Sequence, residues 1–160
     1  MDDVVFRETQ RMPSSWRVPL LLLAAGGAVL YVVSIAVAGQ TGPASLVALV
    51  AITAGLAVAA LALVAKLEVV VTRTAVEIRW VPLARRTIPF ATIREAEVVT
   101  YRPVRQFGGW GIRMGRSGAR AYSMSGDRAV RVVLHDGKEL YLGSLEPEAL
   151  AAAIDRARVR

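Results

Sequence analysis

The chain has 160 residues and a net charge of +7, with 54% hydrophobic and only 6% aromatic residues. Its mean hydropathy of +0.45 is high for a soluble protein and indicates that apolar residues are concentrated in one block. The sequence has no cysteine, which excludes disulfides, thiolate metal sites and cysteine nucleophiles. Without clusters of His and Cys, it also offers no transition-metal site, and we expect no cofactor.

The apolar block extends over residues 18–65, where no side chain is charged, and "GQTGP" at 39–43 interrupts it. This pattern predicts two membrane helices, at 18–38 and 44–65, joined by an extracytoplasmic turn. At about 1.5 Å per residue, each helix can cross a hydrocarbon core of about 30 Å. Because no Asp, Glu, Lys, Arg or His lies at membrane depth, the sequence does not favour a pump or transporter.

Positive charge flanks the two helices but is missing from the turn between them. The flanking basic residues are Arg7, Arg11, Arg17, Lys66 and Arg73. Such a distribution predicts a two-pass protein of the inner (cytoplasmic) membrane with residues 1–17, residues 66–160 and both termini in the cytoplasm. We expect Trp16, Arg17 and Lys66 at the membrane interface.

Two alternatives remain open for the apolar segments. "AVA" at 36–38 matches an A-x-A cleavage site, so the first segment can be read as a signal peptide, although its apolar run exceeds the usual length of about 7 to 15 residues. Small residues recur along the second helix at Ala48, Ala51, Gly55, Ala59 and Ala62. They permit close approach of the first helix or of a second copy of the chain.

After residue 66 the pattern changes to alternation of apolar and polar residues, which predicts strands. The candidate strands lie at 69–71, 76–80, 86–90, 93–101, 109–114, 119–124, 129–134 and 139–142. For the last two, a three-residue loop, His135-Asp136-Gly137, pairs Val132 with Leu140 and Val130 with Leu142. A helix is predicted at 147–158, with Pro147 at its start and arginines at its end.

Several short stretches follow one another in a recognisable order. They are "FRETQR", "RRTIPFATI", "GGWGIR", "AYSMSGDRAVRV", "DGKELYLGS" and "PEALAAAI". In this order the chain resembles bacterial membrane proteins that carry a pleckstrin-homology-like (PH-like) domain after a two-helix transmembrane hairpin. The resemblance implies a mainly-β PH-like domain at 66–160, a bent antiparallel barrel of about seven strands capped by the C-terminal helix. It also implies no enzymatic activity and a role in binding or assembly.

Phosphoinositide binding, which eukaryotic relatives of this fold perform through their first hairpin, does not follow from the resemblance. The first predicted hairpin here is short and offers only Arg73 and Arg79. That function is therefore not expected of this chain.

The stretch "FGGWGIRMG" at 107–115 combines several glycines with one tryptophan. Neither G-x-G-x-x-G nor a P-loop is present, so nucleotide binding is not supported. Glycines within a strand indicate a bulge or a close backbone approach, with Trp110 covering the bare positions. The alternative is a recognition surface from which Trp110 and Arg113 project.

Residues 101–131 are the most polarised part of the chain, with a single acid, Asp127. Their arginines are Arg102, Arg105, Arg113, Arg116, Arg120, Arg128 and Arg131. Anionic lipid headgroups are the nearest partner for a membrane-tethered basic surface. A weaker interpretation of these arginines is that they bind nucleic acid through backbone contacts, with stacking on aromatic residues. The third interpretation is a solvated face. The candidate ligand residues are Arg102, Arg105, Trp110, Arg113 and Arg116.

No arrangement of residues indicates catalysis. His135 lies in a predicted turn beside Asp136, and no G-x-S-x-G elbow accompanies it. We therefore expect a non-enzymatic, membrane-anchored binding or assembly module that contacts membrane lipids and a protein partner or a second copy of itself, but not nucleic acid. The alternative is an accessory subunit of a larger membrane complex assembled through the two helices.

Overall fold

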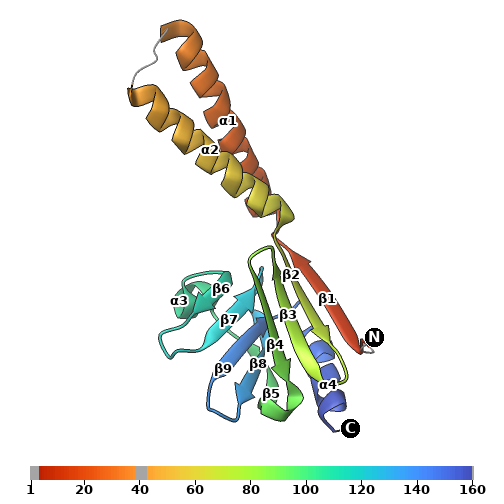
Figure 1. The fold of residues 1–160 in the computed structure, drawn as a ribbon. Helices are drawn as coiled ribbons and strands as arrows, with labels where there is room; N and C mark the ends of the chain where they lie inside the picture. The colour runs from red at the N-terminus through yellow and green to blue at the C-terminus, as the bar shows by residue number, and fades with distance from the viewer. Residues whose placement is uncertain (1–3, 39–42, 160) are drawn as a thin grey trace. The chain divides into compact units, whose positions relative to one another are not determined.

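The computed structural model describes residues 4–38 and 43–159, which form two compact units. One unit is Met12–Ala65, and the other joins Met1–Arg11 to Lys66–Arg160 (Figure 1). Four of the five residues in the predicted turn at 39–43 lie outside the described residues. The N-terminal residues thus belong to the same unit as the chain that follows the apolar block.

The first unit consists of the helices α1 (Ser14–Ala38) and α2 (Pro43–Val64), which pack against each other. Both are long and apolar enough to cross a membrane. Large apolar side chains such as Leu23, Leu30 and Val47 are at least 70% exposed, so these helices are hydrophobic on their outward faces too. A helix that is apolar on all sides is typical of a bilayer rather than of water. Of the small residues predicted to allow close approach, Ala59 and Ala62 are buried.

The second unit is built from two β-sheets (Figure 1). Sheet A has the order β1-β2-β3-β4, and all its neighbours are antiparallel. Its strands are β1 (Phe6–Arg11), β2 (Lys66–Val71), β3 (Ala75–Val81) and β4 (Ala84–Pro89). The last three were expected from sequence, whereas β1 was not, and it places the N-terminal segment directly beside the strand that follows α2.

Sheet B has the order β5-β8-β9-β7-β6. Its strands are β5 (Ile93–Thr100), β6 (Gly111–Met114), β7 (Arg120–Ser123), β8 (Arg128–Leu134) and β9 (Glu139–Gly143). A single-turn 3-10 helix, η1 (Phe90–Thr92), connects the two sheets. The expected mainly-β unit with a C-terminal helix is confirmed, but the expected bent antiparallel barrel of about seven strands needs correction in two respects. The nine described strands form two separate sheets, and β7 runs parallel to β9 because the β6–β7 hairpin is added beyond β9.

The main core lies between the inner faces of the sheets and α4 (Pro147–Arg158), which packs against β5, β8 and β2. The alternation of each strand sends Leu67, Val69 and Val71 inward, and all three are fully buried. From α4, Leu150, Ala153 and Ile154 meet them, as the predicted apolar stripe requires. Full burial of each such Leu, Ile or Val side chain contributes about 1.5 to 3 kcal/mol to stability.

The β8–β9 hairpin has the predicted register and loop. Val132 lies opposite Leu140, and Val130 lies opposite Leu142. The backbone N–H of Leu134 donates to the carbonyl of Lys138 at 2.9 Å, and Gly137 has a φ of 82°. The left-handed conformation of that glycine closes the three-residue loop as expected.

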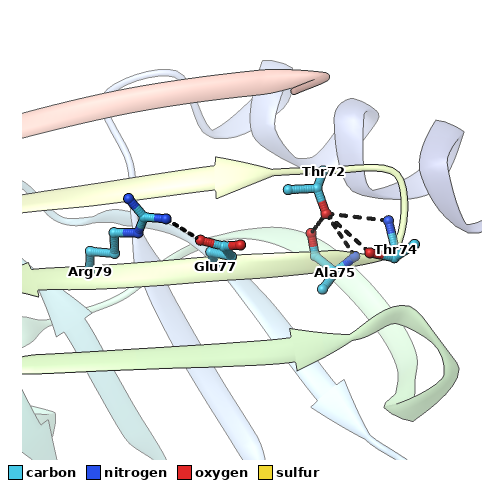
Figure 2. Close-up of polar contacts among 5 residues, drawn as sticks. All are labelled: Thr72, Thr74, Ala75, Glu77 and Arg79. Atoms are coloured by element: carbon cyan, nitrogen blue, oxygen red, sulfur yellow. Dashed lines mark hydrogen bonds and ion pairs between the residues drawn. The ribbon is translucent and has the colours of Figure 1, made fainter. Parts of the chain in front are cut away.

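The β2–β3 turn is held by one threonine. Thr72 Oγ1 accepts hydrogen bonds from the N–H groups of Thr74 (3.3 Å) and Ala75 (3.1 Å), and its hydroxyl lies 3.0 Å from the Ala75 carbonyl oxygen (Figure 2). A hydroxyl that satisfies the turn's own backbone in this way stabilises a tight connection. Because β1 precedes the helices and pairs with β2, these two strands form the first hairpin of sheet A. The β2–β3 turn therefore belongs to the second hairpin.

Candidate functional site

Helix α3 (Pro103–Phe107), which the sequence did not predict, packs its Phe107 against Tyr101 and Tyr141 beside sheet B. Pro103 occupies its first turn, where the missing N–H costs nothing. At its other end Gly108 adopts a φ of 74°, and the N–H groups of Gly108 and Gly109 donate to the carbonyls of Val104 and Pro103. A glycine in the left-handed conformation commonly caps the C-terminus of a helix in this way. The first two glycines of "FGGWGIRMG" therefore terminate α3, and β6 begins two residues later than Gly109, where the strand was predicted to start.

An aromatic cluster fixes α3 to the sheet. The rings of Tyr101, Phe107 and Tyr141 lie with centroids 5.1 to 5.9 Å apart in edge-on and tilted arrangements. Ala119, Ala121 and Ala129 complete this second, smaller core. Such aromatic pairs contribute about 0.5 to 1.5 kcal/mol beyond the area that they bury. The cluster gives α3 a defined position and with it the arginines at its start and centre.

A cavity of about 570 Å³ opens between α3, the β6–β7 connection and β9. It is lined by Thr100, Tyr101, Arg102, Arg105, Gln106, Phe107, Gly115, Arg116, Ser117, Ala119 and Tyr141. Three of the five candidate ligand residues, Arg102, Arg105 and Arg116, are among them, and no acidic residue is. We call this the α3 cavity. Its floor is aromatic, and its rim carries three positive charges.

The arginines of the α3 cavity are not neutralised by the protein. Within the described parts of the chain, no ion pair involves Arg102, Arg105, Arg113 or Arg116, and all four are exposed. Some arginines elsewhere are paired, as Arg79 is with Glu77 at 2.6 Å (Figure 2). Arg131 likewise lies 2.7 Å from Glu97. The charge at the α3 cavity is thus available to an external anion.

Trp110 and Arg113, the other two candidate residues, lie outside the lining of the α3 cavity. The indole N–H of Trp110 donates to the carbonyl of Gly126 at 2.8 Å, and the ring is half-buried. Arg113 Nε in turn donates to the Trp110 carbonyl at 3.0 Å. These bonds attach the start of β6 to the turn before β8.

The expectation that Gly109 and Gly111 allow close backbone packing is wrong. A Cβ added at Gly109 would meet no atom within 4 Å, and at Gly111 it would meet only Arg113 Nε at 3.9 Å. Both residues instead have positive φ angles, 128° and 108°, which side chains disfavour. The close approach is at Gly115, where a Cβ would lie 2.9 Å from the Phe107 ring.

Tyr101, which lines the α3 cavity, has a buried hydroxyl. Its side chain is 3% exposed, and burial raises the pKa of its phenol above the ordinary 10.0. The geometry between the Tyr101 and Ser123 hydroxyls is not that of a hydrogen bond, so Tyr101 Oη and Ser123 Oγ both lack a partner among the described residues. The Tyr101 hydroxyl therefore donates no hydrogen bond to a described residue.

A second cavity, of about 530 Å³, occupies the open side between the sheets. Buried Ile78 and Leu140 form part of its lining, and Arg86 Nη1 donates to the Tyr122 hydroxyl at 3.2 Å within it. Arg85, Arg120 and Lys138 lie at its edges, and Glu139 is its single acid. This cavity is basic, like the α3 cavity, but lies on the opposite face of sheet B.

Polar residues of β1 make a buried network that sequence reasoning missed. Glu8 and Gln10 lie opposite Val69 and Leu67 and therefore face the core. Glu8 accepts hydrogen bonds from the Ser144 hydroxyl and from the Leu145 N–H (2.7 Å), and Gln10 Nε2 donates to the Gly143 carbonyl at 2.7 Å. The strand before α1 is thereby fastened to the segment between β9 and α4.

Three residues were expected at a membrane interface. Trp16 lies in the first turn of α1 and is 58% exposed, and Arg17 follows it. Lys66 is the first residue of β2, where its ammonium lies 2.7 Å from Glu68 and, through this hydrogen bond, lowers the pKa of that carboxyl. All three lie close to the points where the chain passes between the two units.

His135 and Asp136 do not form a catalytic pair in the described structure. The Asp136 carboxylate instead accepts from the backbone N–H of Lys138 at 3.1 Å and from its ammonium at 2.6 Å, which lowers the pKa of the carboxyl. Among residues 4–38 and 43–159, no group of three or more His, Cys, Asp or Glu residues could hold a metal ion.

Comparison with known proteins finds no family model, no curated protein and no solved structure that matches this chain. Its function is therefore inferred from its own residues and geometry.

Proposed function

We propose that this chain is a membrane-anchored, non-catalytic binding module whose PH-like β unit lies at the cytoplasmic face of the inner membrane and contacts anionic lipid headgroups. The observation that carries the proposal is the α3 cavity, where Arg102, Arg105 and Arg116 surround an aromatic floor without an acidic partner. Each basic residue near an anionic surface contributes about 1 kcal/mol to its attraction. Arginine also binds phosphate oxygens in a bidentate geometry.

Short connections between the two units support a location at the membrane surface. Two residues separate β1 from α1, and one residue separates α2 from β2. A chain spans at most about 3.6 Å per residue, so these strand ends cannot move more than about 10 Å from the helix ends. With α1 and α2 in a bilayer, the strand ends that join them lie within about one Debye length of the headgroups, where charges attract effectively.

The pairing of β1 with β2 favours an uncleaved two-pass chain over a signal peptide. Cleavage after residue 38 would remove β1 and with it the partners of Ser144, Leu145 and Gly143. The same pairing favours an arrangement in which both ends of the helical unit lie on one side of the membrane. The basic residues next to the helices make the cytoplasm the favoured side.

Membrane topology is tested with a reporter fused after Arg160. We expect activity from a reporter that works only in the cytoplasm, and an intact N-terminus in the purified protein. Activity of a periplasmic reporter, or a mature chain that begins at Gly39, would contradict the proposed arrangement.

Headgroup contact is tested with the full chain in nanodiscs of phosphatidylcholine, with and without phosphatidylglycerol. A fluorophore on Ser117→Cys, at the rim of the α3 cavity, reports proximity to headgroup-labelled lipids, and no native cysteine competes for the label. We expect stronger quenching with the anionic lipid, reduced by high salt and by replacement of Arg102, Arg105 and Arg116 with glutamine. Quenching that is indifferent to lipid charge would refute the proposal.

The matched control removes the same charge elsewhere in the β unit. Arg94, Lys138 and Arg156 lie outside the α3 cavity, and their combined replacement by glutamine also lowers the net charge by three. This variant should retain the lipid-dependent quenching. If it lost the quenching to the same extent as the cavity variant, overall charge rather than the α3 cavity would be responsible.

A second candidate function, that of an accessory subunit, is favoured by an apolar groove between α1 and α2. The groove has a volume of about 440 Å³ and includes Gly27 and Gly55. Small residues of this kind let a further transmembrane helix pack closely. Pull-down of the full chain from membranes distinguishes the two functions, because Gly55→Leu would release a membrane partner while the arginine variant would keep it.

A further inference from the structure

The turn between β3 and β4 lies at the end of sheet A where the chain leaves for the helices and returns from them. In the strand register Arg11 pairs with Lys66, and Lys66 pairs with Val81. The turn residues Pro82 and Leu83 follow Val81 directly. Figure 1 shows the β3–β4 turn at the same end of the sheet as the close of β1 and the start of β2.

This turn is apolar, whereas turns at the other end of the β unit are polar. Leu83 is 63% exposed, and Pro82 is exposed beside it. Thr72 and Thr74 lie in the β2–β3 turn at the opposite end of the sheet (Figure 2), and Arg73 stands between them in the chain. Exposing a large apolar side chain to water forfeits the free energy of burying it, so a leucine at the end of sheet A that connects to the helices gains from an apolar environment there.

The charge beside Leu83 also suits a lipid interface. Arg85 is exposed and makes no ion pair with a described residue, whereas Arg79, which lies opposite it in the β3–β4 ladder, is paired with Glu77. An apolar tip with a cation next to it can place its side chain below the headgroups while the guanidinium stays among the phosphates. A turn that binds a protein partner would not need to lie next to the strand ends that continue into the helices.

We propose that the β3–β4 turn inserts Leu83 into the interfacial layer of the same bilayer that α1 and α2 cross. This inference rests on the proposed membrane location. It adds a third point of attachment beside the two covalent connections, in the row that Arg11, Lys66 and Val81 form across sheet A, and it limits how far this end of the sheet can lift from the membrane.

Because the chain has no native cysteine, single-cysteine labelling tests the proposal directly. The full chain is reconstituted in nanodiscs that contain spin-labelled lipids, with an environment-sensitive fluorophore on Leu83→Cys. Thr74→Cys, in the turn at the opposite end of the sheet, is the matched control. Leu30→Cys, which is 72% exposed on α1, reports whether the helices lie in lipid.

We expect lipid quenching at positions 30 and 83 that is several-fold greater than at position 74. Strong quenching at position 30 with equal, weak quenching at 83 and 74 would overturn the inference and leave the membrane anchor intact. Weak quenching at position 30 would overturn the proposed function and the inference together. The three labelled chains thus separate failure of the turn from failure of the anchor.

In a second measurement the fluorophore is attached to another residue, so that the side chain at position 83 is tested without a label. With the fluorophore on Thr87→Cys, an exposed position of β4 that leaves Arg85 in place, the additional substitution Leu83→Met should retain quenching by lipid, whereas Leu83→Asp should reduce it. Since Leu83 is exposed in a turn, neither substitution should alter the circular dichroism of the β unit. Equal quenching in the two variants would contradict the insertion of residue 83.

Discussion

Arg11 and Lys66 lie opposite each other in the β1–β2 ladder, although the whole helical unit, Met12–Ala65, separates them in the chain. The two helices therefore occupy the connection of what is otherwise an ordinary antiparallel hairpin. Such hairpins can be closed by turns of a few residues. The β unit thus contains all of its own strands once the helices are set aside.

Replacing residues 12–65 with a short Asn-Gly turn should produce a water-soluble β unit that unfolds cooperatively in urea. The control chain, 66–160, lacks β1 and leaves the edge of β2 uncovered, so it should be markedly less stable or aggregate. Size-exclusion chromatography and urea denaturation measure both properties. Equal stability of the two chains would mean that β1 contributes nothing to the sheet.

Substitution of Glu8 by alanine should lower the free energy of unfolding by about 2 to 3 kcal/mol, because Ser144 and the Leu145 N–H lose a charged acceptor inside the protein. Glu95→Ala, at an exposed position in β5, should change it by less than about 0.5 kcal/mol. Denaturation of both variants in urea, followed by tryptophan fluorescence, provides the comparison. A Glu8 variant as stable as the Glu95 variant would contradict the network.

Gly137→Ala should lower stability by about 1 kcal/mol, because a φ of 82° strains any residue with a Cβ. Asparagine tolerates this conformation better, so Gly137→Asn should cost less. No atom lies within 4 Å of the added Cβ, so the loss reflects the backbone and not a collision. Thermal melting of the three proteins gives the order glycine, asparagine, alanine; the reverse order of the last two would exclude backbone strain as the cause.

Tyr101→Phe should leave stability unchanged or raise it by up to about 1 kcal/mol, since it removes a buried hydroxyl that has no partner. The raised pKa of Tyr101 favours the neutral phenol in the folded protein. The stability that depends on a neutral Tyr101 phenol is therefore fully present below pH 10, and it is lost as the pH rises through the folded-state pKa. Urea denaturation between neutral and strongly alkaline pH should show a weaker decline for the phenylalanine variant. A large loss at neutral pH would indicate a partner for the hydroxyl.

Local sequence was sufficient for much of the β unit. Alternating apolar residues predicted β3 and β8, and the position of Gly137 selected both the loop and the register between Val132 and Leu140. These features depend on neighbours within a few residues. The two apolar helices were equally clear, because their composition alone distinguishes them.

Features that depend on distant residues were not predictable in the same way. In β1 the core-facing positions hold Glu8 and Gln10, whose burial is stabilised by groups more than 130 residues away, so the strand's polar pattern resembled a solvated segment. The parallel pairing of β7 with β9 joins strands that are not consecutive, and it moved the sheet away from a closed barrel. The α3 cavity depends on a five-residue helix that is too short for any periodic signal.

The position of β1 ahead of the helices also determines the order of events during biosynthesis. This strand leaves the ribosome before the helices, and at about 5 to 20 residues per second its partner β2 follows only after several seconds. Sheet A can close only when both helices have inserted and returned the chain to the side that it left. A chain whose second helix fails to insert keeps β1 and β2 on opposite sides of the bilayer. The β unit therefore folds only in chains whose two helices have inserted correctly. Misinserted chains stay unfolded and are exposed to proteolysis.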